Sequence, residues 1–234
     1  MIYGAVLAGG IGERLGLGMP KQFYKIGDKP ILIHSVEAFL KVDDFDYIIV
    51  SSPKEYIDET RKTIEEYIED TEKIIVIEGG VTRNDTILNS IEQTDKKEDS
   101  IMVTHDGARI FVSPEQIQKS INCAKEHVAS CPVIPSTDVI FKSMDKKHLD
   151  EIPLRKNLFR AQTPQGFKIK RFIEIYDDLT DDEIKLLDEA MALFHLRGED
   201  ICLFEGDPSN FKITTPFDID VAETMINKKN NFDS

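Results

Sequence analysis

A run of glycines with two cations near the start of the chain has the composition of a phosphate-binding loop. The run reads Leu7-Ala8-Gly9-Gly10-Ile11-Gly12-Glu13-Arg14-Leu15-Gly16, and Pro20-Lys21-Gln22 comes soon after it. Glycines permit a tight turn and let backbone N–H groups approach an anion closely. Arg14 and Lys21 would add two fixed positive charges to those donors. Because the loop follows an apolar segment, residues 2–7, that reads as a buried strand, the sequence predicts a polyphosphate site at a strand end.

Two commoner phosphate-binding loops do not fit these residues. A Walker loop ends in Gly-Lys-Ser or Gly-Lys-Thr, but no glycine in this loop precedes a lysine. A dinucleotide-binding loop counted from Gly10 would need its third glycine where Leu15 stands, and an acidic residue after the second strand. The second predicted strand ends instead in Ser51-Ser52-Pro53. Leu15 and the Ser51-Ser52-Pro53 strand end therefore exclude a dinucleotide-dependent oxidoreductase.

The charge balance of the chain narrows its function class. Its 234 residues carry 29 Lys and Arg against 43 Asp and Glu, a net charge of −14, and 41% of them are hydrophobic. A chain of this length can bury one sizeable core, and its negative charge disfavours nucleic acid or an anionic membrane as partner. The apolar runs are far shorter than a membrane span, and the first residues contain no basic signal-peptide region. We therefore expect a cytoplasmic protein that binds neither nucleic acid nor membrane.

Segments with strand and helix patterns alternate along the chain. The predicted strands cover residues 2–7, 47–51, 73–77, 100–104, 129–135 and 201–204; the predicted helices cover 30–40, 55–68, 84–93, 113–127, 180–197 and a last one from 215, with 228–234 expected to fray. This alternation predicts an α/β fold, a Rossmann-like, mostly parallel sheet with helices on both faces, in a single domain of residues 1–234. Ligands of such sheets bind outside the carboxyl ends of the strands, and the candidate motifs begin there, at Leu7, Ile77 and Thr104.

Residues 137–158 break this alternation. They contain short β-like pieces with charges and no helical period, and a loop of this length is uncommon inside one compact domain. Spaced apolar residues such as Val139, Phe141 and Ile152 have no partner surface on their own sheet. We expect this segment to project as an arm and to pair with a second copy of the chain about a twofold axis.

Five sequence blocks, in the same order, resemble the cytidylyltransferase branch of the nucleotidylyltransferases, which uses CTP. The blocks are Leu7 to Gln22, Gly79-Gly80-Val81-Thr82-Arg83, His105-Asp106-Gly107-Ala108-Arg109, Ala161-Gln162-Thr163-Pro164-Gln165 and Asn210-Phe211-Lys212-Ile213-Thr214. The resemblance spans nearly the whole chain, and five ordered blocks are far more specific than any one of them. Two bacterial groups fit: the 2-C-methyl-D-erythritol 4-phosphate enzymes of isoprenoid synthesis and the D-ribitol-5-phosphate enzymes of teichoic-acid synthesis.

The reaction implied by this resemblance suits the residues present. A phosphate oxygen of a polyol phosphate attacks the α-phosphorus of CTP, and pyrophosphate leaves. Because the nucleophile is already a phosphate oxygen, the enzyme needs mainly charge neutralisation and in-line placement of two polyanions. Such a site should be rich in cations and hold a carboxylate for Mg²⁺. Asp106, an acid at a predicted strand end beside the phosphate loop, is a natural ligand for that ion.

The resemblance also implies roles for individual residues. Mg²⁺ is the expected cofactor with Asp106 as its ligand, and His105 is expected to orient its neighbours rather than to act as a base. The other assignments are Arg14, Lys21 and Lys212 as catalytic cations; Leu7, Ala8, Gly9, Gly10, Gly12, Gly79, Gly80, Arg83 and Thr86 around CTP; and Arg109, Arg155 and Thr163 at the acceptor. Because the family's arm clasps a second subunit, the resemblance implies a homodimer in which Arg155 reaches the neighbour's acceptor phosphate.

The sequence signals for the acceptor are mixed. The forms of Leu7-Ala8-Gly9-Gly10 and Ser51-Ser52-Pro53-Lys54-Glu55 look like the ribitol-phosphate enzymes, whereas Ala108-Arg109 and Asp188-Glu189-Ala190 look like the erythritol-phosphate enzymes. Gly107 and Ile110 depart from the family's pattern, and Leu187 replaces the Thr that is usual in the erythritol-phosphate group. We expect D-ribitol 5-phosphate as acceptor, with 2-C-methyl-D-erythritol 4-phosphate as the alternative.

A second function class is a nucleotide-binding regulator that has lost catalysis. Such a relative would be expected to lose one or more of the charged residues that the reaction needs. Arg14, Lys21, Asp106 and Lys212 are all present, so the sequence favours an active enzyme.

Overall fold

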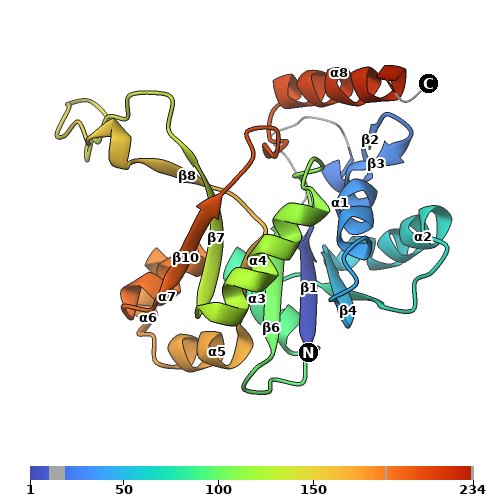
Figure 1. The fold of residues 1–234 in the computed structure, drawn as a ribbon, viewed down its shortest axis with the longest axis horizontal. Coiled ribbons are helices and arrows are strands. Elements are labelled where there is room, and N and C mark those ends of the chain that lie inside the picture. Colours follow the sequence, from blue (N-terminus) through green and yellow to red (C-terminus); the bar gives the residue numbers. More distant parts are fainter. Residues whose placement is uncertain (11–18, 188, 233–234) are drawn as a thin grey trace.

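The computed structural model describes residues 1–10, 19–187 and 189–232, which are built around one eight-stranded sheet (Figure 1). The strands are β1 (Ile2–Leu7), β4 (Tyr47–Ser52), β5 (Ile74–Glu78), β6 (Ile101–Asp106), β7 (Ala129–Pro135), β8 (Phe159–Ala161), β9 (Gln165–Lys168) and β10 (Ile201–Glu205). Their order is β10-β7-β9-β6-β1-β4-β5, with β8 paired to β7. β1 runs parallel to β4 and β6, β4 to β5, and β10 to β7, whereas β8 and β9 pair antiparallel with their neighbours. The predicted mostly parallel sheet is confirmed.

Helices cover both faces of this sheet, as the alternation predicted. They are α1 (Ile31–Leu40), α2 (Ile57–Tyr67), α3 (Arg83–Ile91), α4 (Pro114–Glu126), α5 (Ile169–Asp177), α6 (Asp181–Leu186), α7 (Ala190–Leu196) and α8 (Pro216–Phe232). Short 3₁₀ turns are η2 (Lys21–Phe23), η3 (Lys54–Tyr56) and η4 (Arg155–Asn157), and β2 (Lys25–Ile26) and β3 (Lys29–Pro30) form a small hairpin. None of the helices in the described part of the chain is long and apolar enough to cross a membrane.

The central strand β1 is buried on both of its faces. Successive side chains of a strand point to opposite sides of the sheet. Val6 accordingly joins a core cluster with side chains of α1, α2 and α4, whereas Ala5 joins a second cluster with side chains of α3, α5 and α7. A strand covered on both faces needs a continuous apolar run, which residues 2–7 supply.

The register of the sheet brings the ends of three strands to the same level. Leu7, the last residue of β1, is paired with Asp106 on β6 and with Ser51 on β4. The glycine loop leaves β1 at this point, so Asp106 lies beside the start of that loop. The hydrogen bonds of the sheet, rather than a flexible connection, therefore fix the placement of this carboxylate.

The structure corrects the sequence prediction in the second half of the chain. β8, β9 and α5 were not predicted, and the single helix expected over 180–197 is two helices, α6 and α7. Leu187 is extended between them, with φ −97° and ψ 99°, and its carbonyl accepts a hydrogen bond from the Asn84 side-chain amide at 2.8 Å. The capping box at Thr180 is confirmed, since its side chain accepts from the Glu183 N–H. Residues 228–232, expected to fray, continue α8.

The segment between β7 and β8 projects away from the sheet, as expected of an arm (Figure 1). An antiparallel bridge joins Lys142 to Glu151 within it. Its apolar side chains are exposed: Val139, Ile140, Phe141, Met144, Leu149, Ile152 and Leu154. The pairing of this arm with a second subunit stays a prediction.

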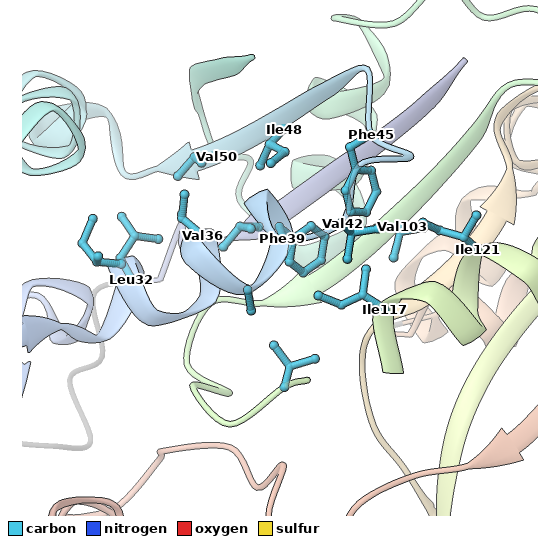
Figure 2. Packing of buried hydrophobic residues seen from close by; sticks show 14 of the residues in the cluster. Leu32, Val36, Phe39, Val42, Phe45, Ile48, Val50, Val103, Ile117 and Ile121 are labelled. Atoms are coloured by element: carbon cyan, nitrogen blue, oxygen red, sulfur yellow. The ribbon is translucent and has the colours of Figure 1, made fainter. Parts of the chain in front are cut away.

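Replacement of Phe39 should destabilise the fold strongly. This ring of α1 is fully buried and stacks on Phe45 with ring centroids 5.2 Å apart (Figure 2). It also packs onto β1 at Gly4, where a Cβ would lie 2.7 Å from Phe39 Cδ1. We expect Phe39→Ala to lower the free energy of unfolding by roughly 3–5 kcal/mol, because it leaves a large cavity in a packed core.

Urea titration measures this loss. The matched control is Phe217→Ala, at a ring that is 72% exposed, which should change stability by less than about 0.5 kcal/mol. Equal, small effects of the two substitutions would contradict the packing around Phe39.

Candidate active site

A cleft of about 610 Å³ opens at the carboxyl ends of β1 and β6, a size usual for small-molecule sites. Residues from distant parts of the chain line it: Leu7, Ala8, Gly9, Gly10, Lys21, Gln22, Ile31, Gly80, Val81, Thr82, Arg83, Thr86, Asp106, Gly107, Ala108 and Lys212. Most of the predicted site residues in the described part of the chain are in this set. The sheet thus brings the first residues of the predicted phosphate loop (Leu7 to Gly10), the Gly79–Thr86 block, Asp106 and Lys212 to one place.

The other predicted residues lie behind the cleft or away from it. A Cβ on Gly79 would lie 3.1 Å from Gly9 Cα, so Gly79 backs onto the phosphate loop. Arg109 and Thr163 do not line the cleft but bond to Asp106, which does. Arg155 lies on the exposed arm, where its Nη1 donates to the Thr137 carbonyl at 3.4 Å. Arg14 and Gly12 lie outside the residues that the structure describes.

The turn between β5 and α3 forms one wall of the cleft and requires a glycine. A Cβ on Gly80 would lie 2.2 Å from the Asp85 Cβ. The Thr86 hydroxyl fixes the turn, because it accepts from the Gly80 N–H at 2.9 Å and donates to the Thr82 carbonyl at 2.9 Å. The first residues of α3 thereby line the cleft, where the positive end of the helix dipole favours an anion.

A buried carboxylate surrounded by cations lies at the base of the cleft. Oδ2 of Asp106 is 3.1 Å from Lys212 Nζ and 3.1 Å from Arg109 Nε, and Oδ1 is 3.8 Å from Arg83 Nε. Burial acts to raise the pKa of Asp106, but Lys212, Arg83 and Arg109 together lower it well below its ordinary value. Asp106 is therefore ionised at neutral pH, and three cations around one carboxylate leave an excess of positive charge for a polyanion.

Arg83 ties this cluster to α7. Its Nη1 lies 3.7 Å from the carboxylate of Glu189, the N-cap of α7, and its Nη2 donates to Gln165 Oε1 at 3.2 Å. The guanidinium is thus held by protein groups on two sides, and a nucleotide phosphate would compete with Asp106 and Glu189 for it.

Lys21 and Lys212 approach the cleft from the same wall. Lys21 stands at the start of η2, and its Nζ donates to the carbonyl of Ile213, the residue that follows Lys212. That contact spans 3.4 Å and joins residues 192 positions apart in sequence. The two predicted catalytic lysines therefore form one cationic wall.

His105 lies in the core behind Asp106, and its tautomer follows from its partners. Nε2 is 3.1 Å from the Arg109 carbonyl, which can only accept, so Nε2 carries the proton. Nδ1 is then an acceptor, and the Thr163 hydroxyl, 2.9 Å away, donates to it. The same Thr163 oxygen accepts from the Asp106 N–H at 3.1 Å. His105 and Thr163 therefore hold the backbone around Asp106 and Arg109, in keeping with the orienting role expected for His105.

The donor set at Asp106 suits a metal ion that takes its other ligands from phosphate and water. Within the described residues, no group of three or more His, Cys, Asp or Glu side chains is placed to hold a metal. Mg²⁺ needs only one or two protein carboxylates when a polyphosphate supplies further oxygens. Asp106 is an ionised carboxylate that lines the cleft beside the glycine loop, so it fits a Mg²⁺–nucleotide complex once its ion pairs rearrange.

Several residues with no role in the sequence prediction take part in the site. Gln22, Ile31, Val81, Thr82, Gly107 and Ala108 line the cleft, and Gln162, Gln165, Glu189 and Asn210 bond to functional segments. Nearly all of them stand inside the recognised sequence blocks. The sequence therefore predicted that the segments containing these residues belong to the site, but it did not predict their hydrogen-bond partners. Ile31, the first residue of α1, had no sequence signal.

Comparison with known proteins points to one family. The family model described as "IspD: 2-C-methyl-D-erythritol 4-phosphate cytidylyltransferase" matches residues 2–228. Among similar solved structures, 4-diphosphocytidyl-2C-methyl-D-erythritol synthase from Anaerococcus prevotii has a TM-score of 0.81 at 24% identity, covering 97% of this chain and 96% of that one. The cytidylyltransferase from Francisella tularensis has a TM-score of 0.79 at 24% identity, with 95% and 98% covered. That from Thermus thermophilus has a TM-score of 0.72 at 25% identity, with 96% and 98% covered.

The burial of His105 should make stability depend on pH. Burial lowers the pKa of His105 from 6.5 to about 4; Asp106 opposes this shift, whereas the charges of Arg109 and Arg83 add to it. The unfolded chain takes up this proton near pH 6.5, but the folded protein resists it down to about pH 4. The stability contribution is therefore fully present above pH 6.5 and is lost as the pH falls toward 4.

We expect a loss of roughly 3 kcal/mol from this group across that window. Urea unfolding midpoints at a series of pH values measure it. His105→Asn, which keeps an acceptor for the Thr163 hydroxyl, should flatten the profile. An identical pH slope in His105→Asn and in the natural chain would contradict the assignment.

Proposed function

Because the chain belongs to the 2-C-methyl-D-erythritol 4-phosphate cytidylyltransferase family and is a nucleotidyltransferase, we propose that it transfers a cytidylyl group from CTP to 2-C-methyl-D-erythritol 4-phosphate and releases pyrophosphate. The family match over residues 2–228 carries this proposal. The cleft supports it, since glycine backbone, a helix N-terminus and lysines converge there, as a polyphosphate requires.

The comparisons reverse the order of the two acceptors expected from the sequence. The matching family model is named for the erythritol-phosphate reaction, and this supports 2-C-methyl-D-erythritol 4-phosphate. D-Ribitol 5-phosphate stays the second candidate for a specific reason. Leu187, whose carbonyl bonds to Asn84 between α6 and α7, stands where the erythritol-phosphate enzymes usually have Thr, and the 51–55 block resembles the ribitol-phosphate enzymes.

In the proposed reaction, an oxygen of the acceptor phosphate attacks the α-phosphorus of CTP while the bond to the pyrophosphate oxygen breaks. The step brings two polyanions together, so catalysis consists mainly of charge neutralisation and in-line placement. Lys21 and Lys212, which form one wall of the cleft, would neutralise the triphosphate and the leaving pyrophosphate. Arg14, from the glycine loop, is the third proposed catalytic cation.

The remaining residues would place the two substrates. The nucleotide is proposed to lie against Leu7, Ala8, Gly9, Gly10, Gly12, Gly79, Gly80, Arg83 and Thr86, and the acceptor against Arg109 and Arg155. Thr163 would act at the acceptor side by holding Asp106, because its hydroxyl already bonds to His105 and to the Asp106 N–H. Mg²⁺, when bound at Asp106, would supply further positive charge to the phosphate oxygens.

Pyrophosphate release tests the proposal, with CTP, Mg²⁺ and a panel of polyol phosphates. We expect turnover with 2-C-methyl-D-erythritol 4-phosphate, and poor turnover when ATP, GTP or UTP replaces CTP, because a site built to bond one base loses affinity for the others. Turnover with D-ribitol 5-phosphate alone would move the acceptor to the second candidate. Absence of turnover with every acceptor would overturn the proposed activity.

Asp106→Asn should impair the response to Mg²⁺ more than it impairs folding. The amide keeps the shape of the side chain but loses the charge that holds the metal and the surrounding cations. We expect kcat to fall by about 100-fold, as is typical when a preorganised charge is lost from a phosphate site, with a raised Mg²⁺ half-saturation. Activity measured over a Mg²⁺ titration checks this.

The control for this experiment is Asp95→Asn. Asp95 is a partly buried carboxylate, bonded to the Ser100 hydroxyl at 2.6 Å, but it lies outside the cleft. Its variant should lose stability and keep the Mg²⁺ response. An unchanged half-saturation and rate in Asp106→Asn would show that Asp106 is not a ligand.

The arm is proposed to build a homodimer. Its apolar side chains are exposed in the single chain, and pairing two arms about a twofold axis would cover both sets with the same contacts. Arg155 is not among the residues that line the cleft of its own chain. Because it lies on the exposed arm, we propose that it contacts the acceptor bound in the neighbour's cleft.

We expect light scattering at micromolar concentration to show a dimer, and Phe141→Ser with Ile152→Ser to give a monomer. Arg155→Ala and Lys212→Ala should each lower activity by about 100-fold, because each removes a charge that faces a phosphate. Mixing the two after subunit exchange should restore about a quarter of the natural activity, since half of the dimers then hold one intact site. A monomeric natural chain would rule out the dimer, and absence of complementation would rule out the shared site.

A further inference from the structure

The segment that carries Lys212 has no regular secondary structure, yet Lys212 has a defined position. Residues 206–215 connect β10 to α8 without helix or strand. A lysine on such a connection would ordinarily sample many rotamers, because its side chain is a flexible four-carbon stem. Here Lys212 Nζ lies 3.1 Å from Asp106, so other contacts must hold the segment in place.

The Gln162 side chain binds the first half of this segment. Its Nε2 donates to the carbonyls of Asp207 at 2.8 Å and Asn210 at 3.1 Å, and its Oε1 accepts from the Asp207 N–H at 3.1 Å. Gln162 is 3% exposed, so its side-chain amide is shielded from water, and the bond to the Asn210 carbonyl is buried throughout. Gly206 allows this approach, because a Cβ there would lie 2.4 Å from Gln162 Oε1.

The Asn210 side chain makes the reciprocal contact. Its Nδ2 donates to the Thr163 carbonyl at 2.8 Å, and Asn210 is fully buried. Its backbone carbonyl also accepts from Arg109 Nη1 at 2.9 Å. Gln162 and Asn210 thus form a clasp, the Gln162–Asn210 clasp, between the segment of Lys212 and the segment of Thr163.

The backbone on the other side of Lys212 is also fixed. The Ile213 N–H donates to the Ala108 carbonyl at 2.9 Å. Lys212 is therefore held between two anchors, and both lead to the turn that carries Asp106 and Arg109. A lysine that contributes charge at a reacting phosphate needs this kind of fixed base, since a misplacement of about 1 Å can cost about 100-fold in rate.

We propose that Gln162 and Asn210 are positioning residues of the transfer reaction, which set Lys212 and Arg109 against the reacting phosphates. The inference rests on the proposed function for the reaction itself and adds residues to which that proposal gives no role. Neither side chain lines the cleft. Both act through the backbone that carries the cations.

Gln162→Glu tests the clasp with little change in size. The carboxylate keeps an acceptor for the Asp207 N–H but loses both N–H donors. We expect kcat to fall by about 10- to 100-fold while the KM for CTP changes by less than about threefold, because placement of the reacting groups is lost rather than uniform binding.

Measuring the effect of Gln162→Glu in a second variant, Lys212→Ala, separates a positioning role from a general loss of structure. In Lys212→Ala, the further change Gln162→Glu should lower kcat by less than it does in the natural chain, because Lys212, one of the two cations that the clasp positions, is already gone. An equal fold-loss in both backgrounds would overturn the proposal.

Gln116→Glu is the matched control. Gln116 is also buried, and its Nε2 donates to the Glu205 carbonyl at 3.2 Å, at the end of β10 and outside residues 207–213. The same exchange there should lower the melting temperature and leave kcat near the natural value. If Gln162→Glu does not fold, Gly206→Ala displaces the same amide from the other side and should give the same kinetic pattern.

Hydrogen exchange gives a readout that needs no substrate. Amides of residues 207–213 should exchange faster in Gln162→Glu than in the natural chain, and no faster in Gln116→Glu. Unchanged exchange would overturn the clasp whatever the activity. A natural chain that is inactive with every acceptor would instead overturn the proposed function and the positioning role with it, while the exchange data still judge the clasp.

Discussion

The arrangement of the site depends on the ion pairs of the Asp106 carboxylate, which is buried at the end of β6. Its cationic partners come from three separate parts of the chain: Arg83 from α3, Arg109 from the turn after β6, and Lys212 from the connection after β10. A buried charge is tolerated only when it is paired and hydrogen-bonded. One carboxylate therefore gathers three cations that would otherwise repel each other, and it does so before any substrate arrives.

The fold could be predicted in those places where local pattern and tertiary environment agree. β1 is an apolar run because both of its faces are covered. Leu7 and Asp106 were recognised as strand-end residues because apolar runs end at or just before them, and their pairing confirms this. The helix break at Leu187 could not be predicted, since its carbonyl partner, Asn84, is 103 residues away in sequence. β9 (Gln165–Lys168), which lies antiparallel between β6 and β7, was missed because it is short and begins at the last residue of a block that sequence reasoning treated only as a motif.

In the candidate site, too, the sequence predicted which residues take part but not which groups they contact. Residue types and order identified Lys21, Asp106 and Lys212, and the structure brings them to one cleft. The sequence did not show that the Thr163 hydroxyl is already engaged with His105 and the Asp106 N–H. Side-chain hydrogen bonds to backbone groups leave no periodic signature, because their partners are set by how distant segments meet.

The charge of the whole chain and the charge of the cleft have opposite signs, which bears on how a nucleotide is bound. A net charge of −14 gives no long-range attraction for a triphosphate. Attraction must come from the cations at short range, where the low-dielectric surroundings strengthen it and salt screens it less than at an exposed surface. In the structure these cations are held by Asp106 and Glu189.

Binding of phosphates must therefore exchange one set of ion pairs for another rather than create new ones from solvent. That exchange limits how far charge alone can distinguish one polyol phosphate from another, since every candidate acceptor carries the same phosphate group. Selection among acceptors must therefore come from contacts to the neutral polyol rather than to its phosphate. The sheet fixes the cations of the cleft, whereas contacts to a polyol would fall to the connections between its strands and helices, which are the parts of a fold that vary most.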